Sequence, residues 1–266
     1  MSEPLLRRIR EALAATADIF ADYEPGRVEA EKKAGGDPVT KADNAVDDLL
    51  HQFLPRGDEG WLSEETTDDL NRLEASRVWV VDPLDGTKEF VLGIPEWCVS
   101  IGYVENGVPV AGGIFNPQSG ETIVGARGEG VTYNGEPTAM SECDTLEGAL
   151  VLGSRSESGR GEWDLFDDAP FTVRPVGSVA YKLALVAAGK ADATWTVVPK
   201  NEWDVAAGVA LILAAGGEAY EPNGQPRTFN SRDPLLSGLV AHPSSLGPDI
   251  KPVIARHRLA QAARAR

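Results

Sequence analysis

Apolar residues recur at helical spacing in two stretches near the N-terminus. From about residue 4 to 22, Leu6, Ile9 and Leu13 fall on one face between charged residues, which predicts an amphipathic helix. The second stretch follows the glycine-rich, charged segment 31–37. There Thr40 and, three residues later, an aspartate have the spacing of a capping box, so we expect a second helix with a buried apolar stripe.

Short apolar runs, which predict strands, follow in the middle of the chain. The run Val-Trp-Val-Val at 78–81 is typical of a buried strand, and Asp82 and Pro83 predict that it then opens into a loop. Further strand-like runs occur at 97–104, 108–115 and 122–127. Asn-Gly at 106–107 and the polar segment 116–120 separate them with hairpin turn composition, so a meander is expected.

From about residue 145, strand-like and helix-like segments alternate, which is typical of an α/β unit. Strands are expected at 149–153, 171–176, 192–196, 218–221 and 236–241, and helices at 178–188 and 204–215. Gly189 and the pair Gly216-Gly217 occupy the positions of helix C-caps. In the tail from Lys251 to Arg266, arginines alternate with alanines, and a frayed terminal helix is favoured over a binding arm.

The charge of the chain narrows the classes of partner. A net charge of −16 argues against a nucleic acid polymer or an anionic membrane, because both bind to basic surfaces. If the substrate is an anion, bound divalent cations are the expected means of inverting the local field.

Targeting and cysteine signals are weak. The N-terminus lacks the pattern of a signal peptide, and no stretch approaches the roughly 18 apolar residues of a membrane span, so we expect a cytoplasmic enzyme. The two cysteines, Cys98 and Cys143, have no His or Cys near them in sequence, which predicts reduced thiols rather than a zinc site or a disulfide framework.

The segment 82–87, Asp-Pro-Leu-Asp-Gly-Thr, is the main candidate for chemistry. A turn at the end of a buried strand can direct the carboxylates of Asp82 and Asp85 to one point. Carboxylates held together favour a hard divalent cation, and magnesium keeps waters that substrate oxygens can displace. Gly86 and Thr87 offer backbone N–H groups to an anion where a short helix is expected. A cation site beside an anion site suits phosphate-ester chemistry.

Each acidic candidate also has an alternative without function. Asp, Pro and Gly favour ordinary surface turns, whereas an EF-hand calcium loop requires a different spacing. The pair Glu64-Glu65 can be a solvated loop. Asp204, in Trp-Asp-Val-Ala-Ala-Gly, can cap the apolar helix that follows it, and Asp43 can be the acidic partner in the capping box of Thr40. None of these positions defines a function by itself.

Together, four motifs in this order resemble the inositol monophosphatase superfamily. They are Val39-Thr40-Lys41-Ala42-Asp43, Ser63-Glu64-Glu65, Asp82-Pro83-Leu84-Asp85-Gly86-Thr87 and Trp203-Asp204-Val205-Ala206-Ala207-Gly208. The resemblance implies an α/β/α/β/α layered sandwich, combining α+β and α/β parts. An N-terminal α+β half, residues 1–145, would hold the metal-binding core, and a C-terminal α/β half, residues 146–266, would complete the active site and substrate pocket.

The resemblance also implies roles for individual residues. The magnesium ligands, for two or three ions, would be Glu64, Asp82, the Leu84 carbonyl, Asp85 and Asp204, with Asp82 bridging two ions. Thr87 and Glu64 would orient and activate the attacking water, Asp43 would support Thr87, and the backbone of Gly86 and Thr87 would hold the phosphate. Homodimers and inhibition by lithium are further expectations.

The substrate depends on residues outside this core. Inositol phosphatases carry a Glu several residues before the Trp-Asp pair, but the corresponding positions here are Thr196 or Val197. Leu84 and the segment Lys88-Glu89-Phe90 look more like the 3′(2′),5′-bisphosphate nucleotidase branch, which acts on 3′-phosphoadenosine 5′-phosphate.

A cationic partner for a second phosphate is expected at Lys200, with an exposed loop lysine as the alternative. Gly177-Ser178 falls where the family binds substrate, although Ser178 can equally be a plain N-cap. A small phosphorylated metabolite is thus the expected partner, with an inositol or sugar phosphate as the second choice. A catalytically silent regulatory binding protein is the alternative from another class.

Overall fold

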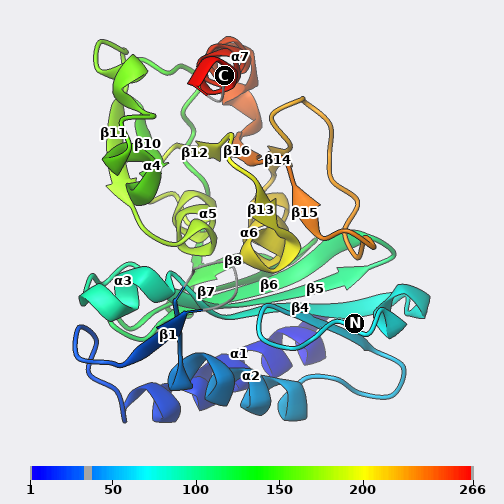
Figure 1. Ribbon diagram of the computed structural model, residues 1–266. Helices are drawn as coiled ribbons and strands as arrows, with labels where there is room; N and C mark the ends of the chain where they lie inside the picture. Colours follow the sequence, from blue (N-terminus) through cyan, green and yellow to red (C-terminus); the bar gives the residue numbers. More distant parts are fainter. Residues whose placement is uncertain (1, 33–37, 265–266) are drawn as a thin grey trace.

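The computed structural model describes residues 2–32 and 38–264, which form alternating layers of helices and sheets (Figure 1). One helical layer covers the outer face of a seven-stranded sheet, a second lies between that sheet and a five-stranded one, and a third covers the far side of the smaller sheet. The expected α/β/α/β/α sandwich is confirmed. The three helical layers consist of α1 (Ser2–Phe20) and α2 (Lys41–Phe53), then α5 (Val179–Ala187) and α6 (Glu202–Ala214), then α7 (Gly247–Arg264).

The seven-stranded sheet contains the predicted meander. Its order follows the chain, and only the first pair, β3 with β4, is parallel. Its strands are β3 (Gly60–Ser63), β4 (Arg77–Asp85), β5 (Cys98–Glu105), β6 (Val108–Asn116), β7 (Glu121–Ala126), β8 (Gly130–Tyr133) and β9 (Glu136–Thr138). Asn106 (φ 50°) and Gly107 (φ 79°) both have left-handed backbone angles, as the hairpin turn between β5 and β6 requires.

The five-stranded sheet has the order β11-β10-β12-β16-β14 and is mixed. Its strands are β10 (Leu150–Ser154), β11 (Thr172–Val176), β12 (Ala193–Thr196), β14 (Gly217–Tyr220) and β16 (Leu239–Pro243). The single strand expected at 236–241 is wrong, because the chain breaks at Gly238 into β15 (Leu235–Leu236) and β16. Gly238 has a φ of 136°, and a Cβ there would lie 2.4 Å from the Thr196 carbonyl oxygen.

Several short elements were not predicted, and the two terminal helices have different limits from those expected. The short elements are β1 (Ala30–Lys32), β2 (Pro38–Thr40), α4 (Arg155–Gly159), β13 (Lys200–Asn201) and the 3-10 turns η1 (Asn71–Glu74), η2 (Asp164–Phe166) and η3 (Ser244–Leu246).

Helix α1 ends at Phe20, and residues 33–37 of the charged segment lie outside the described residues. Helix α7 is packed rather than frayed, because Ile250 and Ile254 are buried in an apolar core with Trp195 and Val240 of the smaller sheet. The predicted end of the tail, at 265–266, lies outside the described residues.

A close contact between α6 and the large sheet connects the two halves. A Cβ at Gly112 would lie 2.4 Å from the Ala207 carbonyl oxygen, and one at Gly102 would lie 2.8 Å from the Ala207 nitrogen. Glycines in β5 and β6 therefore let the backbone of α6 lie directly on the sheet. The helix is apolar on all sides, which fits its place between two sheets. This contact brings Asp204, in the first turn of α6, towards the end of β4.

The predicted division at residue 145 falls between β9 and β10. One apolar core contains residues of both parts, including Ile114 from β6, Leu183 from α5 and Leu211 from α6. The division into an N-terminal and a C-terminal half at this residue thus stays a prediction. Among residues 2–32 and 38–264, no helix combines the length and the apolar character that crossing a bilayer requires.

Replacement of Gly112 tests the contact between α6 and the sheet. We expect Gly112→Ala to lower the free energy of unfolding by about 3 kcal/mol, because the added methyl group overlaps the backbone of α6. Gly159→Ala is the matched control, since a Cβ at this position of α4 has open space. Chemical denaturation measures both variants. Equal midpoints for the two would contradict the close contact.

Candidate active site

Strand β4 carries the segment 82–87 into the site through a β-bulge. The predicted loop after Val81 is wrong, because β4 continues to Asp85. Asp82 pairs with Ser100 and Asp85 with Cys98, so three steps along β4 match two along β5. Pro83 has no N–H for the ladder, which a bulge tolerates in an internal strand. Residues 82 and 85 would face opposite sides of a regular strand, and the extra residue allows both to line one cavity.

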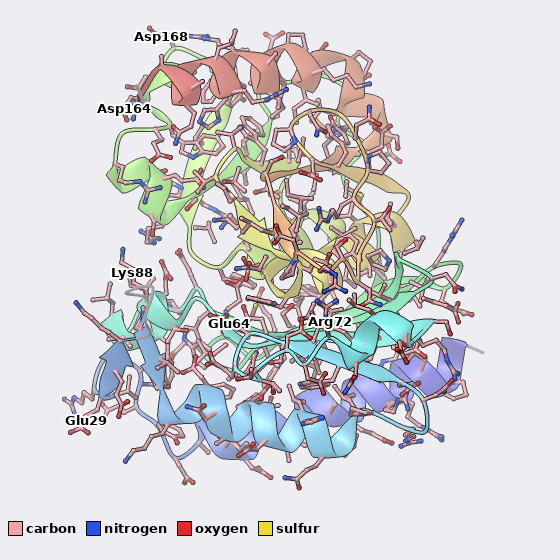
Figure 2. The ribbon with its side chains drawn as sticks, turned by 45° about the vertical axis from the view of Figure 1, so that its right-hand side comes forward. Glu29, Glu64, Arg72, Lys88, Asp164 and Asp168 are labelled. Carbon is pink, nitrogen blue, oxygen red and sulfur yellow. The ribbon has the colours of Figure 1, made fainter. Side chains whose placement is uncertain are left out.

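Three carboxylates converge in that cavity from separate elements. Glu64 follows β3, Asp82 lies in β4 and Asp204 lies in α6, and one carboxylate oxygen from each lies within 4.8 Å of the others. Glu64 lies at the junction of the lower and upper halves of the molecule (Figure 2). The cavity has a volume of about 300 Å³, and its lining includes every expected metal and phosphate residue: Glu64, Asp82, Leu84, Asp85, Gly86, Thr87, Gly177, Ser178, Lys200 and Asp204.

Three of the aspartates are each anchored by one oxygen. Asp204 Oδ2 accepts from the Asn201 N–H at 2.8 Å, which closes the capping interaction of α6. Asp82 Oδ1 accepts from the Leu84 N–H at 3.0 Å. Asp85 Oδ2 accepts from Ser178 Oγ and from the Ala180 N–H, both at 2.6 Å. The second oxygen of each accepts no hydrogen bond from the described residues and is therefore available to a cation.

Asp43 and Thr87 form a separate pair beside the cluster. Asp43 Oδ2 accepts from the Thr40 N–H at 2.7 Å, as the predicted capping box requires, and also from the Thr40 hydroxyl at 2.6 Å. Its Oδ1 accepts from the Thr87 hydroxyl at 3.0 Å, and the Leu84 carbonyl lies at the same distance from that hydroxyl. Capping and support of Thr87 thus use different oxygens of one carboxylate. Burial raises the pKa of Asp43 despite these donors.

The carboxylate cluster resists full ionisation. Burial, followed by the charges of Glu64, Asp85 and Asp204, raises the pKa of Asp82 well above its ordinary value. Burial, with Asp85 and Glu64, raises the pKa of Asp204 to about 8. Since the cluster offers only oxygen ligands, it fits a hard cation such as Mg²⁺ better than a metal that prefers nitrogen or sulfur.

Cationic side chains line the rest of the cavity. Besides Lys200, the lining includes Lys88, Arg155 and Lys182. Lys182 is buried in α5, where its Nζ donates to the Ser178 carbonyl at 2.8 Å and to the Val176 carbonyl at 3.2 Å. Burial lowers the pKa of Lys182 to about 8.

Sequence reasoning missed Arg155 and Lys182. The guanidinium of Arg155 pairs with both carboxylate oxygens of Glu96 at 2.7 Å, and Glu96 also accepts from the Gly177 N–H at 2.7 Å. A lysine inside the apolar run 179–187 was the available signal for Lys182, whereas Arg155 gave none.

Ser178 lines the cavity, whereas Thr196 and Val197, the positions considered for an acidic substrate ligand, do not. Ser178 is an N-cap, since its Oγ accepts from the Tyr181 N–H at 3.0 Å. The same hydroxyl donates to Asp85, and the backbone of Ser178 has an unusual φ of 49°. Thr196 donates its hydroxyl to the buried Glu157 and does not line the cavity, nor does Val197. Neither Thr196 nor Val197 therefore contributes to the lining of the cavity.

The layered fold and the oxygen-ligand cluster beside a bulged strand are the features expected of a metal-dependent phosphatase. The chain belongs to the inositol monophosphatase family, whose sequence profile matches residues 2–258. This family consists of metal-dependent phosphatases, generally with Mg²⁺, so the chain is a phosphoric monoester hydrolase.

Similar proteins are known in sequence and in structure. The fructose-1,6-bisphosphatase/inositol-1-monophosphatase of Thermotoga maritima is 32% identical over 82% of this chain and 85% of its own length. The structure of the T. maritima inositol monophosphatase superposes with a TM-score of 0.81 at 28% identity, covering 97% of this chain and 98% of that one. CysQ of Bacteroides thetaiotaomicron, a bacterial member of the family, has a TM-score of 0.75 at 28% identity, covering 91% and 97% of the two chains.

The raised carboxyl pKa values predict that Asp82→Asn stabilises the metal-free protein. A pKa above the unfolded value means that the unfolded chain ionises first as pH rises, so stability is lost from about pH 4 upward. We expect the free energy of unfolding of the metal-free variant to be higher than that of the wild type by about 1 kcal/mol at pH 8, and by less at pH 5. Thermal denaturation with EDTA measures this difference.

Magnesium should then make the wild type more stable than Asp82→Asn. At pH 8 it should raise the melting temperature of the wild type but not that of Asp82→Asn, because the variant lacks a central ligand. Asp18→Asn, at an exposed position of α1, controls for the change in charge. Equal magnesium shifts in the wild type and Asp82→Asn would count against this cluster as the metal site.

Proposed function

We propose that this enzyme is a Mg²⁺-dependent phosphomonoesterase whose preferred substrates carry a second anionic group. The observation that carries the proposal is that one cavity is lined by both acidic and cationic side chains. Its carboxylates include Glu64, Asp82 and Asp204, and its cationic groups include Arg155 and Lys200. A phosphate beside the metal ligands and a second anion near the lysine and arginine would each find a partner of opposite charge.

The family resemblance and the second carboxylate oxygens of Asp82, Asp85 and Asp204 support a set of metal ligands. Glu64, Asp82, Asp85, Asp204 and the Leu84 carbonyl would hold two or three magnesium ions. Bound magnesium supplies a lowered pKa for the attacking water and charge stabilisation of the leaving oxygen. The anchored oxygens of the aspartates keep the free ones in place, so little reorganisation is needed at the moment of reaction.

The water is oriented by the side chains next to the cluster. Thr87 has one hydroxyl proton, which Asp43 and the Leu84 carbonyl attract, so its oxygen is left as an acceptor for the water. Glu64 is the second group that would take part in activating the water. The N–H groups of Gly86 and Thr87 would hold the phosphate where α3 (Thr87–Leu92) begins.

Replacement of Thr87 tests the orientation of the water. We expect Thr87→Val to lower kcat roughly 100-fold with a small change in KM, because the variant keeps the shape but loses the hydroxyl. Thr87→Ser is the matched control and should retain most of the activity, since it keeps the hydroxyl. Steady-state phosphate release measures both, and similar kcat values for Val and Ser would exclude this role.

The cationic groups of the cavity favour bisphosphates as substrates. 3′-Phosphoadenosine 5′-phosphate, favoured by the segment 88–90, and fructose 1,6-bisphosphate, named for the T. maritima relative, both have a second phosphate. Inositol 1-phosphate has none. Among the described residues the cavity is lined by no aromatic side chain, so it offers an adenine ring no stacking surface. Recognition would therefore depend on the second phosphate rather than on a base.

A comparison of substrates tests the proposed function. With Mg²⁺ we expect kcat/KM for both bisphosphates to exceed that for inositol 1-phosphate by roughly tenfold or more. Lys200→Gln should reduce the bisphosphate values and leave inositol 1-phosphate nearly unchanged. A preference for inositol 1-phosphate would refute the proposed specificity. Absence of phosphate release from all three would favour the alternative of a silent binding protein.

A homodimer, lithium inhibition and a cytoplasmic location stay predictions.

A further inference from the structure

A second cavity, larger than the catalytic one, lies at the opposite end of β3 and β4. Its volume is about 480 Å³. Glu59 precedes β3 and Arg77 begins β4 at this cavity, whereas Glu64 and Asp82 lie at the catalytic ends of the same strands. Five residues of extended strand span about 16 Å, so the two cavities are separate sites. The residues that line it are Pro4, Leu5, Arg8, Arg56, Glu59, Arg77, Tyr103, Glu105, Val110, Ala126 and Arg127.

The inner part of this cavity is a completed hydrogen-bond network. Glu59 accepts from Arg8 at 2.8 Å, from Tyr103 at 2.9 Å and from the indole of Trp79 at 2.9 Å. Arg8 also lies 4.6 Å from the centre of the Trp79 ring. Burial alone would raise the pKa of Glu59, but the donors around it outweigh burial and lower this pKa. Glu59 is thus a satisfied carboxylate that needs no further cation.

Two arginines of the lining, unlike Arg8, have no carboxylate partner for their guanidinium groups among the described residues. Arg56 and Arg127 are exposed, and no described carboxylate lies within ion-pair distance of either. Arg77 pairs with the exposed Asp58 at 2.5 Å, and Glu105 is the remaining acidic residue of the lining. Four arginines around one cavity are unusual in a chain with a net charge of −16. Two guanidinium groups are left for an external anion.

The walls between the rim and the inner network are largely apolar. Leu5 from α1, Val110 from β6 and Ala126 from β7 contribute side chains without hydrogen-bonding groups, and the ring of Tyr103 adds an aromatic face. A hollow with apolar walls and a few polar groups is typical of small-molecule sites. Its occupant would need an apolar body and an anionic end.

We propose that this cavity is a binding site for a small organic anion with an aromatic or other apolar body, held at its anionic end by Arg56 and Arg127. The apolar body lies against Leu5, Val110 and Tyr103. The ligand does not undergo phosphate hydrolysis, because the metal-binding carboxylates lie at the other end of the strands.

A pair of isosteric probes tests the proposal on the full chain. Naphthalene-2-sulfonate has an aromatic body and one charge and is no phosphate ester, and naphthalene-2-sulfonamide is its neutral counterpart. We expect saturable binding of the sulfonate, measured by naphthalene fluorescence and by calorimetry. The double variant Arg56→Gln/Arg127→Gln should bind it roughly tenfold or more weakly, because two charge-assisted contacts are lost.

The controls separate this site from general charge effects and from the catalytic cavity. Arg7→Gln/Arg27→Gln removes two exposed arginines elsewhere and should leave the affinity for the sulfonate unchanged. Arg155→Gln/Lys200→Gln should also leave it unchanged. Equal affinities of the wild type and the Arg56/Arg127 variant, equal binding of the neutral sulfonamide, or weaker binding only in the Arg155/Lys200 variant would each overturn the proposal.

Discussion

The active site depends on the direct contact of α6 with the large sheet. Helices normally rest on sheets through their side chains, but Gly102 and Gly112 allow the backbone at Ala207 to touch β5 and β6. A larger residue at either glycine would lift α6 and carry Asp204 away from Asp82. Since the two carboxylates belong to different halves of the chain, this packing contact decides whether the cluster exists. Tight packing of an apolar helix thereby sets the geometry of a polar site.

Local hydrogen bonds then determine how each carboxylate is presented. Asp43 and Asp204 are the third residues of capping boxes, and that structural role occupies one oxygen of each. Asp43 uses the other oxygen for Thr87, and Asp204 directs it towards the cluster. The structural interpretation of these aspartates is therefore compatible with the functional one. A carboxylate has two oxygens, so a helix cap can also orient a reactive group.

The sequence predicted the layers and the acidic side of the site, because both depend on local patterns or on a specific motif. Helical spacing indicated α2, Asn-Gly indicated the hairpin at 106–107, and the segment 82–87 indicated the carboxylate cluster. The bulge in β4 was missed, because Pro83 after a buried strand is equally typical of a loop, and only pairing with β5 decides between them.

Arg155 was missed for a related reason. Its place in the cavity depends on Glu96, which lies 59 residues earlier in the chain. No local pattern connects the two residues, and neither has a distinctive neighbour in sequence. The second cavity is likewise assembled from six separate segments, so its arginines look like ordinary surface charges until the fold brings them together.

Hydrogen bonds through Ser178 connect the carboxylates of the catalytic cavity to the buried Lys182. Asp85 is held by Ser178, and the carbonyl of Ser178 in turn accepts from the buried Lys182. Rising pH removes protons from the cluster, where Asp204 has a pKa of about 8, and so favours the cation. The same rise removes the proton of Lys182, whose pKa is also about 8, and weakens its hold on the carbonyls that shape the Ser178 turn. A bound Mg²⁺ would lower the pH at which the carboxylates of the cluster ionise, because the cation favours their charged form.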